Sequence, residues 1–89
     1  MSVIRIPPTL REQTGGARQV EADGETVRDL LEDLMSRFPA LRHQLVEDDD
    51  LAPFVNVYVE GEDVRMREGL DTEVRHGSTV ILLPAMAGG

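Results

Sequence analysis

The sequence contains no cysteine, no lysine and no tryptophan. Without cysteine, the chain cannot form disulfides, bind an iron–sulfur cluster or a metal through thiolates, or use a cysteine nucleophile. Without lysine, it has no side-chain amine that could form a Schiff base or accept an isopeptide bond; all 9 cationic side chains are arginine. These absences exclude several classes of covalent chemistry from the side chains of this protein.

Positive charge is also scarce. The 89 residues carry a net charge of −8 and have a sequence pI near 4.5, so nucleic acid and anionic membranes are poor partners. A basic face on another protein is a better one. No apolar run approaches the roughly 20 residues of a membrane span, and no basic-then-apolar leader follows Met1. We therefore expect a cytoplasmic protein.

The length allows one domain with one core. Alternation of apolar and polar residues, or a run of β-branched ones, predicts strands. The strongest lies over 79–83 and is the most apolar, which predicts a central position in the sheet. The predicted strands cover residues 3–6, 18–22, 54–59, 64–66 and 79–83, with turns at 14–16, 60–63 and 76–78.

One segment has the period of an α-helix. Its apolar residues fall at positions 27, 30, 31, 34, 35 and 38, which places them on one face. Thr26 is placed to cap the helix, Asp29 follows three residues later, and Pro39 prevents its continuation. Beyond it, Leu41–Ala52 is less regular: a short helical turn and then the charge run of residues 47–50.

The order of the elements predicts the fold class. A right-handed crossover would carry the chain from an N-terminal hairpin over one sheet face, leaving the first and last strands side by side. The result is α+β: a mixed four- to five-stranded sheet with one main covering helix, which is the β-grasp or ubiquitin-like layout. We expect residues 1–84 to form this domain and residues 85–89 to form a flexible C-terminal tail.

The tail carries the most specific motif. Two successive glycines at a given position arise by chance in about one case in 200. The sequence closes on the second glycine, so we expect the free α-carboxylate to belong to Gly89 and to be the chemical site. Glycine lets a backbone thread a narrow, water-excluding channel because it lacks Cβ. Gly88 and the arm formed by Ala85, Met86 and Ala87 would provide access to that channel.

The whole chain resembles a known family. The 54–59 strand, the Leu83–Gly89 ending and the β-grasp order are similar to those of the ThiS/MoaD family of ubiquitin-like sulfur carriers. Within this family the chain is most similar to the CysO type, and the early segments Pro7–Arg11 and Thr14–Gly16 fit that type too. Among these features only the diglycine is a specific motif.

The resemblance implies a carrier that is not itself an enzyme and binds no cofactor. The carboxylate of Gly89 would be adenylated with ATP by an E1-like enzyme and converted to a thiocarboxylate. A pyridoxal-phosphate (PLP)-dependent cysteine synthase would take the sulfur onto an aminoacrylate. A peptidase would then release cysteine from the carrier.

Alternatives remain open. The ending also resembles the small subunit of molybdopterin synthase, and a ubiquitin-like modifier would share the activation step. The sequence shows no paired catalytic carboxylates, no nucleophile with its base and no spaced metal ligands. No serine lies in the context that a phosphopantetheine carrier needs. Phe54, Tyr58 and Leu70 are candidates for docking to partners, although a small core needs most apolar side chains inside.

Overall fold

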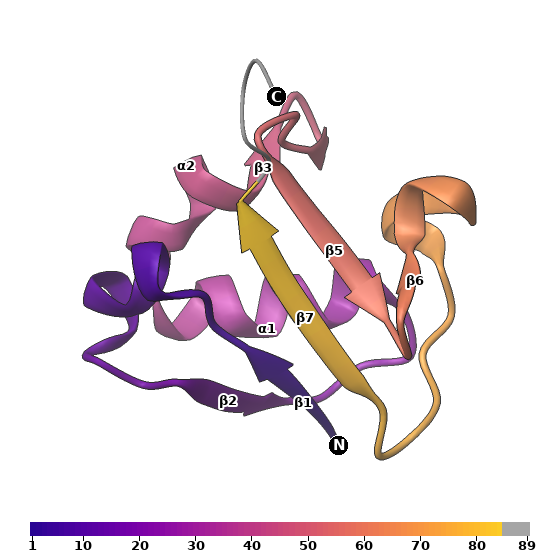
Figure 1. Ribbon diagram of the computed structural model, residues 1–89, viewed down its shortest axis with the longest axis horizontal. Coiled ribbons are helices and arrows are strands. Elements are labelled where there is room, and N and C mark those ends of the chain that lie inside the picture. Colours follow the sequence, from indigo (N-terminus) through magenta and orange to yellow (C-terminus); the bar gives the residue numbers. More distant parts are fainter. Residues whose placement is uncertain (85–89) are drawn as a thin grey trace.

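The computed structural model describes residues 1–84, and the fold rests on one five-stranded sheet (Figure 1). Its strand order is β2-β1-β7-β5-β6. The bounds of these strands are β1 (Ser2–Arg5), β2 (Gln19–Ala22), β5 (Val55–Val59), β6 (Glu62–Asp63) and β7 (Thr79–Pro84). The predicted tail, residues 85–89, lies outside the described residues.

The last strand lies at the centre of the sheet, as the sequence predicted. β7 pairs in parallel with β1, with Ile4 opposite Val80, and antiparallel with β5, with Val57 opposite Leu82. The other pairs, β1 with β2 and β5 with β6, are antiparallel. The sheet is therefore mixed, and the predicted α+β β-grasp fold is confirmed.

The main helix, α1 (Val27–Arg37), forms as predicted and crosses behind the sheet in Figure 1. Its N-terminus is capped by Thr26, whose Oγ1 accepts a hydrogen bond from the Asp29 N–H at 3.2 Å. The Asp29 carboxylate in turn accepts from the N–H of Glu25, also at 3.2 Å. These bonds satisfy donors that a helix start otherwise leaves free.

The core lies between α1 and the inner face of the sheet. Ile4, Val57, Val80 and Leu82 point from the sheet toward the helix, and each has 0% of its surface exposed. From the helix side, the predicted apolar stripe is buried as well; its fully covered members include Leu30 and Leu34. Burying each such side chain favours folding by about 1.5–3 kcal/mol.

The connection between β1 and β2 contains a helix that the sequence pattern did not reveal. The 3₁₀-helix η1 (Pro8–Thr14) follows β1, with proline in its first turn and Leu10 buried. It ends at the predicted glycine turn, where Gly15 and Gly16 have φ of 66° and 88°. A helix this short has too few residues to show a period, which is why alternation alone suggested a plain hairpin.

The predicted strand over 64–66 is wrong. Val64–Met66 is the 3₁₀-helix η3, and the strand β6 covers the two residues before it. Asp63 causes the change, because its Oδ1 accepts the backbone N–H of Arg65 at 2.9 Å and so caps the helix. Val64 then turns into the core with 0% exposure.

The less regular segment contains several short elements. The predicted helical turn is present as η2 (Pro39–Leu41) followed by α2 (Arg42–Leu45). The charge run then forms a small hairpin of β3 (Val46–Glu47) and β4 (Asp50–Leu51), separate from the main sheet. Its turn is tight, since Asp48 and Asp49 have φ of 52° and 62°. Later in the chain, Gly69–Asp71 forms the 3₁₀-helix η4.

Adjacent leucines in β7 allow a matched test of this packing. We predict that Leu82→Ala lowers the free energy of unfolding by about 2–5 kcal/mol, because it removes buried atoms and leaves a cavity. Leu83→Ala is the control, since Leu83 lies on the other face with 43% of its surface exposed, and should cost less than about 1 kcal/mol. Urea denaturation measures both. Equal losses would contradict the assignment of the two faces.

Candidate functional site

The residues to which the sequence assigns the chemistry, Gly89 and Gly88 with the access residues Ala85, Met86 and Ala87, lie outside the described residues. The structure describes the chain as far as Pro84, the last residue of β7. The described part of the candidate site is therefore the surface around Pro84, which we call the tail base.

The sheet fixes the position of the tail base. β7 has a hydrogen-bonded neighbour on each side: Arg5 of β1 is opposite Ile81, and Val55 of β5 is opposite Pro84. A strand held on both edges cannot move without breaking two ladders of hydrogen bonds. The ladder with β1 ends at Ile81, whereas the ladder with β5 continues to Pro84, so the tail base is held by β5.

A groove of about 190 Å³ lies beside Pro84. Its walls come from three parts of the chain: η1, α2 and the start of β5. Phe54 lies just before β5 and keeps 46% of its surface exposed, although phenylalanine is among the residues most often buried. The residues that line the groove are Thr9, Leu10, Gln44, Phe54, Val55 and Pro84.

The outer face of the sheet is also partly apolar near the tail base. Tyr58 and Ile81 are cross-strand neighbours on this face, and both are half-buried. Toward the end of β7, Leu83 lies opposite Asn56. Because no described helix covers this face, these side chains remain accessible to a partner.

A cation borders the tail base. The Arg65 guanidinium donates from Nη2 to the Ala52 carbonyl at 2.7 Å, and from Nη1 to the Val55 carbonyl and Asn56 Oδ1, both at 2.8 Å. Ala52 lies in the segment that leads into β5, and Val55 and Asn56 are the first two residues of the strand. The sequence analysis did not single out Arg65, because its neighbours were read as a strand and only the tertiary fold brings it to this segment.

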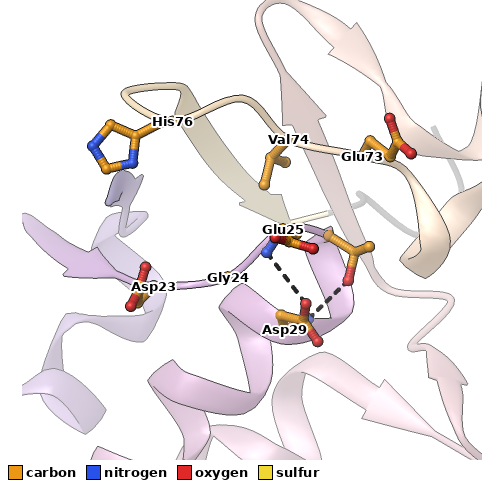
Figure 2. Close-up of a pocket in the computed structure, with 8 residues that line it drawn as sticks. Asp23, Gly24, Glu25, Asp29, Glu73, Val74 and His76 are labelled. Atoms are coloured by element: carbon orange, nitrogen blue, oxygen red, sulfur yellow. Dashed lines mark hydrogen bonds between the residues drawn. The ribbon is translucent and has the colours of Figure 1, made fainter.

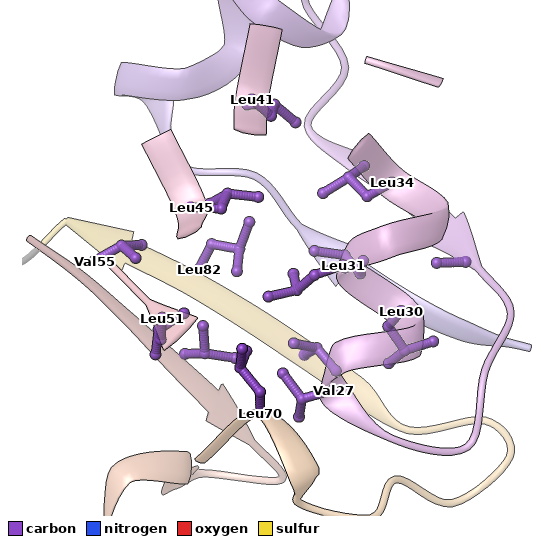
Figure 3. Packing of buried hydrophobic residues seen from close by; sticks show 14 of the residues in the cluster. Val27, Leu30, Leu31, Leu34, Leu41, Leu45, Leu51, Val55, Leu70 and Leu82 are labelled. Carbon is purple, nitrogen blue, oxygen red and sulfur yellow. The ribbon is translucent and has the colours of Figure 1, made fainter. Parts of the chain in front are cut away.

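The three predicted docking residues have different surroundings. Phe54 lines the groove at the tail base, and Tyr58 is half-buried on the outer face of the sheet. Leu70 is only 4% exposed and belongs to the core. Figure 3 shows its side chain among those of Val27 and Leu51. Leu70 is therefore removed as a docking candidate, because η4 turns it inward beneath α1.

A larger pocket lies elsewhere, beside the N-terminus of α1 and the turn that precedes β7 (Figure 2). Its volume is about 830 Å³, and acidic side chains dominate its lining. Three of its residues have structural roles. Thr26 and Asp29 form the helix cap, and His76 has its Nδ1 2.6 Å from the Met1 amine. Its lining residues are Asp23, Gly24, Glu25, Thr26, Asp29, Glu73, Val74 and His76.

The pocket and the tail base lie at opposite ends of the sheet. The turn before β7 lines the pocket, whereas Pro84 closes the same strand. Within residues 1–84, no three histidine, aspartate or glutamate side chains are arranged to hold a metal ion. None of the helices in this part of the chain has the length and apolar character needed to span a membrane.

Comparison with known proteins gives a consistent result. The model of the ThiS family matches residues 4–89. The sulfur carrier protein CysO of Mycobacterium tuberculosis is 39% identical over 89 residues, which cover 97% of this chain and 96% of that protein. Small archaeal modifier protein 3 of Haloferax volcanii is 36% identical with the same coverage of both chains.

Among solved structures, the crystal structure of the Amycolatopsis orientalis BexX/CysO complex contains a chain of the same fold. It superimposes with a TM-score of 0.94 and 45% sequence identity, and the match covers 100% of both chains. The likeness therefore includes the fold described above, with the tail base.

The helix cap at the large pocket allows a direct test. We predict that Thr26→Ala lowers the free energy of unfolding by about 1 kcal/mol, because the N–H of Asp29 loses its acceptor. Thr26→Ser keeps a hydroxyl at this position and should stay close to the parent protein. Thermal denaturation of both variants distinguishes the cap from a general effect of mutation. A loss in Thr26→Ser as large as in Thr26→Ala would rule out the cap as the cause.

Proposed function

Because the chain belongs to the ThiS family, we propose that it is a CysO-type sulfur carrier that is loaded at the carboxylate of Gly89. The observation that carries the proposal is the family match, which extends through Gly88 and Gly89. The pairing of β7 with β5 as far as Pro84 supports it, because an enzyme can bind the folded domain while it acts on the residues that follow. In this role the protein is a co-substrate, and its partners supply the catalysis.

The loading chemistry needs a carboxylate and little else from the carrier. A carboxylate oxygen of Gly89 attacks the α-phosphorus of ATP in an E1-like enzyme, and pyrophosphate leaves. A sulfur nucleophile then attacks the acyl carbon and AMP leaves, so that sulfur replaces one oxygen of the carboxylate. The absence of cysteine from the chain means that no internal thiol competes for the acyl-adenylate. Glycine offers the least hindrance to both steps.

The acceptor in this proposal is a PLP-dependent cysteine synthase. The thiocarboxylate is the sulfur nucleophile, and PLP in the acceptor enzyme activates the carbon that receives the sulfur. The product stays attached to Gly89 until a peptidase cleaves it and regenerates the free carboxylate. The likeness to CysO supports this route; the cytoplasmic location expected from the sequence belongs to the same proposal.

One alternative has a specific observation in its favour. The similarity to a small archaeal modifier protein suggests that the activated glycine could instead be joined to amines of other proteins. The chain has no lysine of its own, so such lysine conjugates would form on a different protein. The two functions share activation at Gly89. They differ in the nucleophile that attacks the activated glycine, which is a sulfur species for the carrier and a lysine amine for the modifier.

We predict that protein purified from its native host under sulfur limitation carries a thiocarboxylate at Gly89. Mass alone would mislead, since replacing oxygen by sulfur adds nearly the same mass as oxidation of one of the 4 methionines. A thiol-selective alkylating reagent avoids the problem, because the chain has no cysteine that could react. Peptide mass spectrometry then locates the label.

Two results would count against the carrier. Repeated absence of the label from native-host protein would overturn the proposal. Recovery of Gly89 mainly in amide bonds to lysines of other proteins would favour the modifier instead.

Bulk near the end of the chain should block activation. We predict that Gly88→Val reduces adenylation by the cognate E1-like enzyme on the order of 100-fold, because a branched side chain misplaces the carboxylate in a narrow channel. Ala40→Val is the control, since residue 40 is exposed in η2. ATP–pyrophosphate exchange measures the reaction. Normal exchange with Gly88→Val would show that the channel does not require glycine there.

A further inference from the structure

The reach of the tail determines which surface an activating enzyme must touch. Five extended residues span at most about 18 Å, so an enzyme that encloses Gly89 comes within that distance of Pro84. This argument rests on the proposed function. An enzyme is wider than this reach. The enzyme surface around the entrance of its channel, which we call the rim, must therefore lie against the tail base.

A positive charge lies at this surface although the protein is acidic overall. Four arginines, at positions 28, 37, 42 and 67, form ion pairs with carboxylates. Arg65 forms none within residues 1–84, and its three acceptors are two carbonyls and an amide oxygen. The nearby Asp63 carboxylate accepts the backbone N–H of Arg65 instead. The guanidinium therefore keeps its full positive charge beside the tail base.

The position of this charge is fixed. Three hydrogen bonds orient the guanidinium, which limits the side-chain entropy that a partner would have to overcome on binding. The Nε–H and one Nη2–H have no acceptor within residues 1–84. A guanidinium with free donors is suited to a carboxylate. Exposed apolar side chains flank the same strand ends, with Phe54 just before β5 and Leu83 opposite Asn56.

We propose that Arg65 is a specificity-determining contact that binds a carboxylate on the rim of the E1-like activating enzyme, while Phe54 and Leu83 make apolar contacts beside it. Apolar surroundings exclude water and strengthen the ion pair. Most of the carrier surface is acidic and would repel an acidic rim. The ion pair between Arg65 and the enzyme's carboxylate therefore forms only when the tail base faces the enzyme. Arg65 thereby sets orientation and does not take part in the chemistry.

The test compares substitutions that separate charge from structure. Arg65→Gln removes the charge, and Arg65→Lys keeps it but loses the planar fork. Arg75→Gln is the matched control: Arg75 is also exposed and forms no ion pair within residues 1–84, but it lies before β7 at the far end of the sheet. Each variant is assayed with the cognate E1-like enzyme by ATP–pyrophosphate exchange, over a range of salt concentrations, and its Tm is recorded.

We expect Arg65→Gln to raise the KM for the carrier about fivefold at low salt, with kcat unchanged, and the difference to shrink as salt increases. Arg75→Gln should stay within about twofold of the parent, and Arg65→Lys, which keeps the charge but loses the fork, should raise the KM by less than Arg65→Gln does. Equal KM values for Arg65→Gln and Arg75→Gln would overturn the inference. A rise shared by Arg65→Gln and Arg65→Lys, with matching losses in Tm, would also overturn it by showing a purely structural role. Absence of exchange with the parent protein would instead refute the proposed function.

Discussion

The pairing of β7 on both sides is the constraint on which the rest of the structure depends. One face of this strand supplies Val80 and Leu82 to the core, so α1 packs correctly only when β7 lies between β1 and β5. The ladder with β5 extends to Pro84 and so positions the tail base. Core stability and the position of the proposed loading site are thus properties of a single strand, and a change that loosens one loosens the other.

The sheet has two ends with different surroundings. One end holds the acidic pocket, the helix cap and the N-terminal amine. The other holds the groove beside Pro84, the exposed Phe54 and the charge of Arg65. A partner that approaches along the arm meets apolar side chains and a cation, although the net charge of the protein is −8. Orientation at such an interface follows from local charge more than from net charge.

Elements that depend on neighbouring residues could be predicted from the sequence. The apolar stripe, Thr26 and Pro39 defined α1, and alternation or β-branched runs identified β1, β2, β5 and β7. The short elements were missed or misjudged because their signals are weak or depend on one side chain. Asp63 caps η3 and turns a predicted strand into a helix, and η1 is too short to show a period.

The sequence by itself determined the fold class, the order of the main elements and the diglycine ending, because periodicity, capping and residue chemistry act over a few positions. Only the tertiary structure decided which apolar side chains are exposed and what each arginine contacts. Leu70 is buried beneath α1, and Arg65 reaches the segment that leads into β5. Both outcomes join residues far apart in the chain, and the packing that brings them together leaves no mark on their immediate neighbours.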